Sequence, residues 1–503
     1  MSYSSLKSGT DIRGFAADGF ENEPLFLSDE RVEKIALGFV AFLCSKSGKK
    51  ADELSVCVGH DSRVSAQRIK SALLRAFSSR GVQVYDCSLA STPAMFMAVL
   101  DLNCDGSVQI TASHHPWERN GLKFFTPDGG LEGSDISAIL ATAEAEDNGN
   151  LALKEGKIKS VDYMSTYAEK LCEMIKKGVN AQDYHKPLAG YKIIVDAGNG
   201  VGGFYAKSVL APLGADITGS QFLEPDGMFP NHIPHPENAA AMESITSATV
   251  KAGADLGVIF DTDVDRAGCV DKNGEEINRN NLVALASVLA LEGTQGGVIV
   301  TDSVTSDGIP EFIKSLGGEH YRYKRGYRNV INKQIELNNQ GEFCPLAIET
   351  SGHAAFKENY YLDDGAYLMT KIIIYLAKNG ADAIKNVLST LAQPKEAKEL
   401  RFGITCDDFK AFGNQVLEKL VEYFSKKNGW KIADDNRDGI RISGDKENGD
   451  GWILLRLSVH DPVMPFNAES NSDGGVKVML NEFYNFIKEQ KSLDITPIEK
   501  FLK

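Results

Sequence analysis

The segment LSVCVGHDSRVSAQRIKSALLRAFSSRGVQVYDC, residues 54–87, changes its apolar periodicity twice. Residues 54–63 form an apolar run that ends in a polar loop, which predicts a buried strand. Residues 64–80 have the apolar spacing of an amphipathic helix, and Gly81 separates it from a strand predicted over 82–87. Strand, helix and strand in this order are typical of α/β layers with mostly parallel sheets.

Three further segments follow the same plan. Each has an apolar strand that ends in a polar loop, over 191–203, 254–268 and 296–318. A helix is predicted after the first of them, over 204–214. Ligands gather at the carboxyl ends of strands in open α/β sheets, so we expect functional residues in these loops.

After about residue 400, the predicted order of helices and strands no longer follows this plan. A helix is predicted over 407–427, short strands over 440–443 and 452–459, and a final helix over 481–492, which together indicate a small α+β domain. At about 150 residues per domain, a chain of 503 residues corresponds to three or four domains. Polar stretches between the segments predict four domains, over 1–158, 159–275, 276–390 and 391–503.

The composition limits the partners of the chain. It has 69 acidic and 54 basic side chains, and its formal net charge is −15. This charge disfavours binding to nucleic acid or to an anionic membrane, because phosphate groups would be repelled, and we expect neither partner. If the ligand is an anion, the cations that bind it must be gathered locally.

The cysteines and the apolar stretches indicate a cellular compartment. Eight cysteines are scattered without a C-x-x-C pair, which favours free thiols in a reducing compartment over a disulfide framework. Residues 1–15 lack the apolar stretch of a secretory signal, and the apolar run over 372–377 is too short to span a bilayer. We therefore expect a cytoplasmic protein.

The segment FDTDVDRAG places Asp261, Asp263 and Asp265 at alternate positions directly after an apolar strand. On extended backbone this spacing points all three carboxylates to one side, where they repel one another unless a cation holds them. Mg²⁺ prefers such oxygen ligands. An EF-hand is excluded because Arg266 replaces the required glycine. A solvated acidic turn is the alternative, but the position at a strand end and the adjacent arginine favour a metal site.

The segment ITASHHPWERNGLKFF, residues 110–125, presents a serine beside two histidines. His114 and His115 are neighbours and point to opposite faces on extended backbone, so at most one can readily reach Ser113. A zinc site is disfavoured, since no cysteine or third histidine stands at ligand spacing. Ser113 is therefore either a nucleophile or an ordinary loop serine, and the rest of the chain has to decide between them.

Charged and hydroxyl side chains recur in six other loops. These are SGTDIRGF (8–15), VGHDSRVSA (58–66), FPNHIPHPEN (229–238), YKRGYRNV (323–330), IETSGHAAF (348–356) and RLSVHDPVMPFNAES (456–470). Each is weak evidence alone. Their order and spacing together are highly specific.

In that order, the motifs resemble the α-D-phosphohexomutases, the family of phosphoglucomutases, phosphomannomutases and phosphoglucosamine mutases. TASHHPWERNGLKFF is similar to the family's phosphoserine loop, DTDVDR to its metal loop, ETSGH to its sugar-binding loop, and RLSVHDP to its C-terminal phosphate loop. The resemblance covers nearly the whole chain. It implies three similar mixed-sheet α/β domains and a C-terminal TATA-binding-protein-like α+β domain around a central cleft.

The resemblance also implies a reaction. Ser113 is expected to carry the phosphoryl group and to donate it to a hexose phosphate, which gives a bound hexose 1,6-bisphosphate as intermediate. One Mg²⁺ per chain would be held by Asp261, Asp263, Asp265 and a phosphoserine oxygen. Small-molecule hexose phosphates are the expected ligands.

Further roles follow from the same resemblance. Arg13, Lys123 and His353 are the candidates for moving or polarising the hydroxyl proton. The remaining residues are expected to bind the sugar hydroxyls or the phosphate that does not react. They are Arg266, Arg328, Glu349, Ser351, Arg456, Ser458 and His460.

The chain departs from the family pattern in the C-terminal phosphate loop. His460 replaces a threonine, Asp461 a glutamate, and Pro465 falls where a second arginine is often found. Mannose and glucose phosphates are the expected substrates, with phosphoglucosamine as the alternative. A non-catalytic sugar-phosphate-binding protein, and an aspartyl-phosphate enzyme with Asp261 as nucleophile, are alternatives of other kinds.

Overall fold

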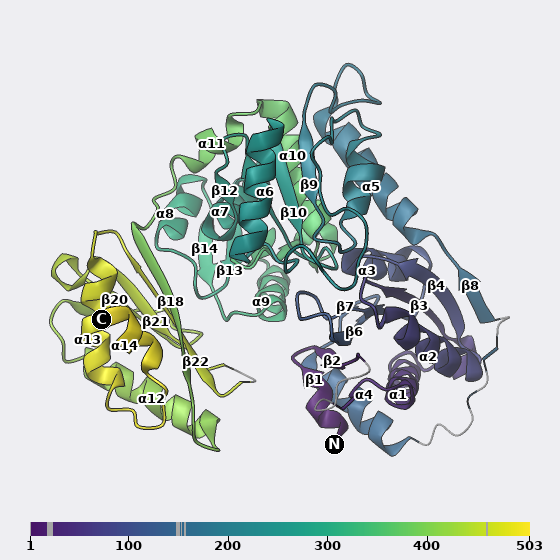
Figure 1. Ribbon diagram of the computed structural model, residues 1–503, viewed down its shortest axis with the longest axis horizontal. Helices are drawn as coiled ribbons and strands as arrows, with labels where there is room; N and C mark the ends of the chain where they lie inside the picture. Colours follow the sequence, from purple (N-terminus) through teal and green to yellow (C-terminus); the bar gives the residue numbers. More distant parts are fainter. Residues whose placement is uncertain (1, 18–23, 147–150, 152, 155–156, 459–460) are drawn as a thin grey trace. The chain divides into compact units, whose positions relative to one another are not determined.

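The computed structural model describes residues 2–17, 24–146, 151, 153–154, 157–458 and 461–503 (Figure 1). Its tertiary contacts divide the chain into two compact units, each of which we describe by itself. The first unit contains Met1–Ala290 and Ser351–Val387, and the second contains Leu291–Thr350 and Leu388–Lys503.

The N-terminal sheet is mixed, with the strand order β1-β2-β6-β5-β3-β4-β8 and β7 paired to β6. Strands β3, β4, β5 and β8 run parallel to their neighbours among themselves, whereas β1, β2, β6 and β7 pair in antiparallel fashion. The strands are β1 (Lys7–Ser8), β2 (Asp11–Phe15), β3 (Ser55–His60), β4 (Gln83–Leu89), β5 (Gly106–Ile110), β6 (Arg119–Thr126), β7 (Gly129–Gly130) and β8 (Ile158–Ser160).

Helices cover both faces of this sheet (Figure 1). Val58 of β3 belongs to a buried apolar cluster with three helices, whereas the adjacent Gly59 faces Met95 of a fourth helix. Successive strand residues point to opposite faces, so the helices lie on opposite sides. The three helices are α1 (Asp29–Ser47), α2 (Ala66–Ser79) and α4 (Gly133–Ala145), and the fourth is α3 (Thr92–Asp101). The strand, helix and strand predicted over 54–87 are confirmed as β3, α2 and β4.

The second sheet has the strand order β12-β11-β10-β9. Its strands are β9 (Ile193–Asp196), β10 (Leu256–Phe260), β11 (Ala267–Asp271) and β12 (Glu276–Ile277). Only β9 and β10 are parallel, and β10 and β11 form a hairpin in which Phe260 pairs with Ala267. Helix α6 (Ala239–Ala252) packs on this sheet against β9, β10 and β11. Helix α5 (Tyr163–Val179) contacts α3, and α7 (Arg279–Leu291) follows β12 in the chain. The helix predicted after β9 is a π-helix over Tyr205–Leu210.

The third α/β layer begins in the second unit. There β13 (Val298–Thr301) pairs in parallel with both β14 (Glu319–Arg322) and β15 (Leu346–Ile348), and the connections are α8 (Gly308–Ser315) and α9 (Tyr327–Asn339). In the first unit, β16 (Ala354–Phe356) and β17 (Leu362–Asp363) form an antiparallel pair followed by α10 (Gly365–Asn379). Helix α11 (Ala383–Leu388) completes this region.

The C-terminal sheet is entirely antiparallel, with the order β18-β22-β21-β20-β19. Its strands are β18 (Glu396–Gly403), β19 (Trp430–Ile432), β20 (Ile440–Gly444), β21 (Gly451–Leu455) and β22 (Val463–Ser470). Its helices are α12 (Phe409–Phe424), α13 (Gly475–Ile487) and α14 (Thr496–Leu502). The predicted helix over 481–492 was wrong in its extent, because the buried apolar face already begins at Val476, and α14 follows it.

These sheets confirm the predicted fold class of three α/β domains and a C-terminal α+β domain, whose sheet is antiparallel. The four domain boundaries, the likeness to the TATA-binding protein and the central cleft stay predictions. All eight cysteines are free thiols, as expected. Among the described residues, no helix combines the length and the apolar character needed to cross a membrane.

A buried aromatic cluster stabilises the C-terminal sheet. Phe466 is fully buried, and its ring centroid lies 4.4 Å from that of Phe483 and 6.0 Å from that of Phe402. We expect Phe466→Ala to lower the free energy of unfolding of this region by about 3–5 kcal/mol, because a cavity replaces the ring. Urea unfolding followed by tryptophan fluorescence measures this, and Val478→Ala, at an exposed position, should change it by less than about 0.5 kcal/mol. Equal midpoints for the two variants would contradict the prediction.

Candidate active site

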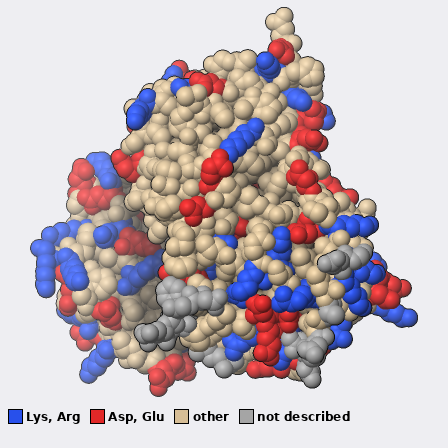
Figure 2. Space-filling model, turned by 45° about the vertical axis from the view of Figure 1, so that its right-hand side comes forward, with Lys and Arg blue, Asp and Glu red and all other residues tan. Residues whose placement is uncertain are grey.

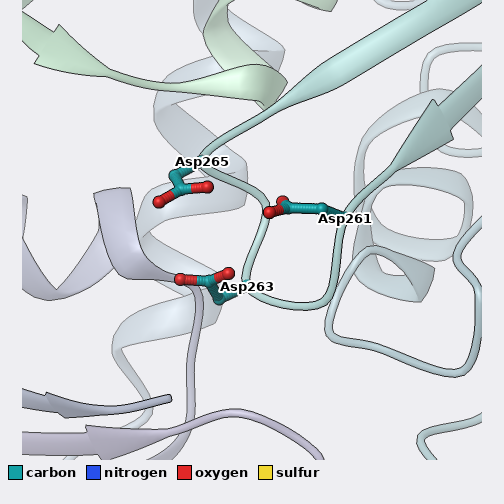
Figure 3. Close-up of side chains that lie close together, drawn as sticks. All are labelled: Asp261, Asp263 and Asp265. Atoms are coloured by element: carbon teal, nitrogen blue, oxygen red, sulfur yellow. The ribbon is translucent and has the colours of Figure 1, made fainter. Parts of the chain in front are cut away.

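Three buried aspartates form the centre of the candidate site. Asp261, Asp263 and Asp265 lie in the loop between β10 and β11, and each offers a carboxylate oxygen within 4.8 Å of the others (Figure 3). The predicted grouping is confirmed, but the loop is a turn and not extended backbone. Val264 has a φ of +65°, an unusual value for a β-branched residue. This turn, rather than a strand's alternation, brings the carboxylates together.

Two buried cations neutralise part of this charge. Lys123 of β6 forms an ion pair with Asp265 and a second with Asp263 at 3.2 Å. Arg266 donates a hydrogen bond of 2.9 Å from Nε to Asp261 Oδ2. The site therefore joins the N-terminal sheet to the hairpin of the second sheet, and one carboxylate charge remains unbalanced.

The crowding changes the acidity of the aspartates. Burial and the neighbouring Asp265 carboxylate raise the pKa of Asp261 well above its ordinary value, although Arg266 opposes them. Burial alone would also raise the pKa of Asp265, but Lys123, His353 and Arg266 hold that pKa well below its usual range. Carboxylates whose environments differ so strongly mark a candidate functional site.

The aspartates suit a divalent cation. Oδ1 of Asp263 and Oδ1 of Asp265 are buried and accept no hydrogen bond within the part of the chain that the structure describes. Buried charged oxygens without donors are costly, and a bound cation would satisfy them. Hard oxygen ligands in a small cluster match Mg²⁺. These residues therefore fit the predicted ion.

Ser113 lies at the edge of the carboxylate cluster. It follows β5, is 3% exposed, and has a φ of +53° in the left-handed region. Its Oγ lies 3.2 Å from Asp261 Oδ2 and also accepts a hydrogen bond from Arg266. A strained residue with its hydroxyl aimed at a charged cluster is typical of a reactive position.

Histidines surround Arg266 but are not free to act as bases. Arg266 donates to His114 Nδ1 at 2.7 Å and to His235 Nε2 at 2.8 Å, so both ring nitrogens serve as acceptors. His114 Nδ1 lies 3.4 Å from Ser113 Oγ, and it is the one neighbouring histidine within reach, as predicted. Burial and the charge of Arg13 lower the pKa of His115 to about 3. Burial and the charge of Arg266 also lower the pKa of His114, so His114 and His115 are neutral at physiological pH.

The other predicted residues of the first unit lie around the same loop. His353 Nε2 is 3.7 Å from Asp265 Oδ1, and its Nδ1 is 3.0 Å from Ser351 Oγ. Arg266 and His353 also form an isolated antiparallel bridge. Arg13 of β2 forms an ion pair of 2.8 Å with Asp11, and its positive charge contributes to the lowered pKa of His115. The structure thus groups Arg13, Ser113, Lys123, Asp261, Asp263, Asp265, Arg266, Ser351 and His353.

The remaining predicted residues belong to the second unit. Glu349 is buried, and its Oε1 accepts a hydrogen bond of 2.6 Å from the Gly326 amide. Arg456 follows β21 and lies 3.5 Å from the Asp438 carboxylate. Arg328 and Ser458 are half-buried. His460 lies outside the described residues.

Two basic residues of the candidate site are buried. Lys123 is 6% exposed and Arg266 is 3% exposed. On the face of the molecule drawn in Figure 2, basic side chains are interspersed with acidic ones. That cations gather around an anionic ligand stays a prediction, since Lys123 and Arg266 face three carboxylates here.

The sequence did not reveal two contributors to the site. Thr92 donates from its amide to the Asp263 carbonyl at 2.9 Å and from Oγ1 to Asp263 Oδ2 at 2.5 Å. His235 binds Arg266, although its loop had been singled out without a role. The residues Ser91, Thr92 and Pro93 are typical of a helix start, but this pattern does not indicate that Thr92 contacts Asp263.

The pairing of Lys123 gives a prediction about stability. Lys123→Met should lower the free energy of unfolding of the metal-free protein by about 3–5 kcal/mol, because two buried carboxylates lose their cation. Added Mg²⁺ should recover much of this loss. Thermal unfolding with and without Mg²⁺ tests it, and Lys46→Met, which breaks an exposed pair with Asp128, serves as control. If Lys123→Met loses the same free energy of unfolding with and without Mg²⁺, Lys123 and Mg²⁺ do not share these carboxylates.

A close backbone contact gives a second prediction. A Cβ at Gly200 would lie 2.5 Å from the Thr262 carbonyl oxygen, between two of the aspartates. Gly200→Ala should therefore displace this loop, cost about 1–3 kcal/mol and weaken Mg²⁺ binding. Calorimetric titration with Mg²⁺ measures the effect. Gly130→Ala, whose nearest atom is 3.7 Å away, should bind the ion as the wild type does.

Comparison with known proteins places the chain in a family. The models of phosphoglucomutase/phosphomannomutase alpha/beta/alpha domains I, II and III match residues 7–150, 166–274 and 278–394. A phosphoglucomutase/phosphomannomutase of Thermococcus kodakarensis is 32% identical over 463 residues, which are 91% of this chain and 94% of the relative. A phosphoglucomutase of Neisseria meningitidis is 29% identical over 440 residues, with coverage of 87% and 89%.

Solved structures agree with this placement. A phosphoglucomutase/phosphomannomutase family protein of Burkholderia thailandensis superimposes with a TM-score of 0.79 at 25% identity and covers 98% of both chains. The fold is also shared, at 14% identity and a TM-score of 0.52, by an N-acetylphosphoglucosamine mutase of Aspergillus fumigatus crystallised with GlcNAc-6P and magnesium, with coverage of 86% and 82%. The chain therefore belongs to the α-D-phosphohexomutase family of enzymes, of the phosphoglucomutase/phosphomannomutase type.

Proposed function

We propose that this protein interconverts the 1-phosphates and 6-phosphates of glucose and mannose, with Ser113 as the carrier of the phosphoryl group. The observation that carries the proposal is the position of Ser113 Oγ, 3.2 Å from Asp261 Oδ2 in a buried cluster of three aspartates. The names of the relatives, phosphoglucomutase and phosphoglucomutase/phosphomannomutase, support the choice of sugars.

The reaction consists of two phosphoryl transfers. The phosphorus–oxygen bond to Ser113 breaks, a new bond forms to the free hydroxyl of the hexose phosphate, and the hydroxyl proton passes to a base. The resulting hexose 1,6-bisphosphate reorients while bound, and its other phosphoryl group is transferred back to Ser113. Catalysis of such transfers depends mainly on positioning and on neutralising charge.

The buried charges suit this task. Asp261, Asp263 and Asp265, together with a phosphoserine oxygen, would hold Mg²⁺, which supplies charge neutralisation for the transferring group when bound. Arg266 already donates to Ser113 Oγ and would stabilise the phosphoryl oxygens in the same place. Lys123 contacts two of the carboxylates that would bind the ion. An ion there would compete for these carboxylates and leave the ammonium available to the transferring oxygen.

The movement or polarisation of the hydroxyl proton is assigned to Arg13, Lys123 and His353. His353 is the best suited of the three, because its unperturbed pKa lies close to neutrality. It lies 3.7 Å from Asp265 and 3.0 Å from Ser351, which would orient its ring. His114 is not a suitable base for Ser113, since Arg266 already donates to its Nδ1.

Substrate binding is assigned to the remaining predicted residues. Glu349 and Ser351 would hydrogen-bond two sugar hydroxyls, in either orientation of the sugar. The phosphate that does not react would be held by the other four, which are Arg328, Arg456, Ser458 and His460. Arg456 is paired with Asp438, so a phosphate would have to compete with this carboxylate.

The structure disfavours the aspartyl-phosphate alternative. Both oxygens of Asp261 accept hydrogen bonds from Arg266, at 3.2 Å from its amide and at 2.9 Å from Nε. A carboxylate held in this way is a poor nucleophile. The alternatives of a phosphoglucosamine mutase and of a non-catalytic sugar-phosphate-binding protein are separated from the proposal by assay.

The test is a coupled assay on glucose 1-phosphate, mannose 1-phosphate and glucosamine 6-phosphate. Ser113→Ala should lower kcat by roughly 10⁴-fold or more with the fold intact, because the phosphoryl carrier is missing. Ser71→Ala, at an exposed serine of α2, should remain fully active. Mass spectrometry should find a phosphate on the 110–125 peptide that survives hydroxylamine. Turnover by Ser113→Ala, or a hydroxylamine-labile phosphate, would overturn the mechanism. Turnover of glucosamine 6-phosphate alone would favour the phosphoglucosamine mutase. If none of the three sugar phosphates is turned over, the non-catalytic binding protein is favoured.

A further inference from the structure

Arg63 is a buried charged residue to which the reaction assigns no role. It follows β3 in the polar loop that begins at Asp61, and its side chain is 0% exposed. A buried guanidinium is costly unless its donors are satisfied. The partners of Arg63 therefore show what the residue does.

Four of these partners are main-chain carbonyls of the loop that carries Ser113. Nη2 of Arg63 donates to the carbonyls of Ser113 and His115, both at 2.6 Å. Nη1 donates to the carbonyls of Pro116 at 2.7 Å and Arg119 at 2.8 Å. One guanidinium thus binds the loop at its first residue, at two in the middle and at its end.

The loop needs such a partner. Four carbonyl oxygens that converge on one point repel one another, and only a planar group with several fixed donors can bind them all. Within the loop, the amides of His115 and Arg119 donate to the carbonyls of Ala112 and Pro116. Ser113 itself has a φ of +53°, a conformation that the surroundings must maintain.

The guanidinium is fixed from two further sides. Its Nε lies 3.3 Å from Asp61 Oδ2, and the Arg63 amide donates to Asp61 Oδ1 at 2.9 Å. The ring of Phe229 lies over the guanidinium, with its centroid 5.2 Å from Cζ. A Cβ at Gly227 would lie 2.4 Å from the Ser62 carbonyl oxygen, so this second segment packs directly on the loop of Arg63. Arg63 is therefore held by both the N-terminal sheet and a loop of the second α/β domain.

We infer that Arg63 is a positioning residue for phosphoryl transfer, which holds the loop over 113–119 in the one conformation that keeps Ser113 Oγ beside Asp261 and Arg266. The inference rests on the proposed function. Arg63 does not touch the reacting oxygen, so its effect reaches the reaction only through the backbone of the loop. A displacement of about 1 Å at the reacting atom is enough to cost about 100-fold in rate.

The test compares Arg63→Met and Arg63→Lys with Arg75→Met. Arg75 is the control, because its guanidinium pairs with Glu33 at 2.8 Å and with Asp29 at 3.2 Å, and these contacts involve no residue of the 113–119 loop. Steady-state kinetics on glucose 1-phosphate and amide hydrogen exchange of residues 113–119 are measured for each full-length variant.

We expect Arg63→Met to lower kcat by about 100-fold and to change KM by less than about threefold. Arg63→Lys should recover less than a tenth of the lost rate, because one ammonium does not reach four carbonyls. The amides of His115 and Arg119 should exchange about tenfold faster in both variants. Arg75→Met should leave kcat and these amides unchanged.

Two results would overturn the inference: a kcat for the Arg63 variants equal to that of Arg75→Met, or a loss of rate without faster exchange in the loop. If Arg63→Met does not fold, Arg63→Lys keeps a buried cation and decides the matter. Failure of the wild type to turn over any hexose phosphate would contradict the proposed function. Wild-type turnover with unaffected Arg63 variants would contradict only the role of Arg63.

Discussion

Crowding of the carboxylates of Asp261, Asp263 and Asp265 is the constraint on which the site depends. Buried charges of like sign repel one another strongly, and the protein neutralises only part of the charge, through Lys123 and Arg266. Because Lys123 lies on a strand of the N-terminal sheet, this neutralisation also ties two α/β domains together. The same ion pairs therefore contribute to stability and keep a position ready for a divalent cation.

The constraint also determines how Ser113 is activated. In a hydrolase, a serine is activated by a histidine base, but here Arg266 donates to both Ser113 Oγ and His114 Nδ1. The guanidinium of Arg266 beside this oxygen would stabilise the negative charge of a phosphoryl group bound there. These surroundings suit the proposed phosphoryl carrier better than a serine that attacks an ester with a histidine as its base.

Much of the site could be predicted because its signals are local. The alternate aspartates and the order of the loops lie in short segments, and the structure groups nine of the predicted residues in one unit. The reason offered for the aspartates was only partly right, since a turn at Val264 replaces extended backbone. Thr92, His235 and the contacts of Arg63 could not be predicted in the same way. Each depends on a partner tens of residues away or more, and a single sequence carries no record of such contacts.

The residues proposed to hold the phosphate that does not react include a cation, Arg456, that already has a partner. Arg456 already has a carboxylate partner in Asp438, and that carboxylate also accepts from Ser303 Oγ at 2.6 Å and from the Arg325 amide at 3.1 Å. A carboxylate held by three donors occupies the place of an anion without leaving a bare buried cation, which would be costly. A phosphate can bind Arg456 only if it interacts with the guanidinium more strongly than the Asp438 carboxylate does. If Arg456 holds the phosphate that does not react, as proposed, the altered phosphate loop and Asp438 act in the same direction, because both reduce the positive charge available to that phosphate.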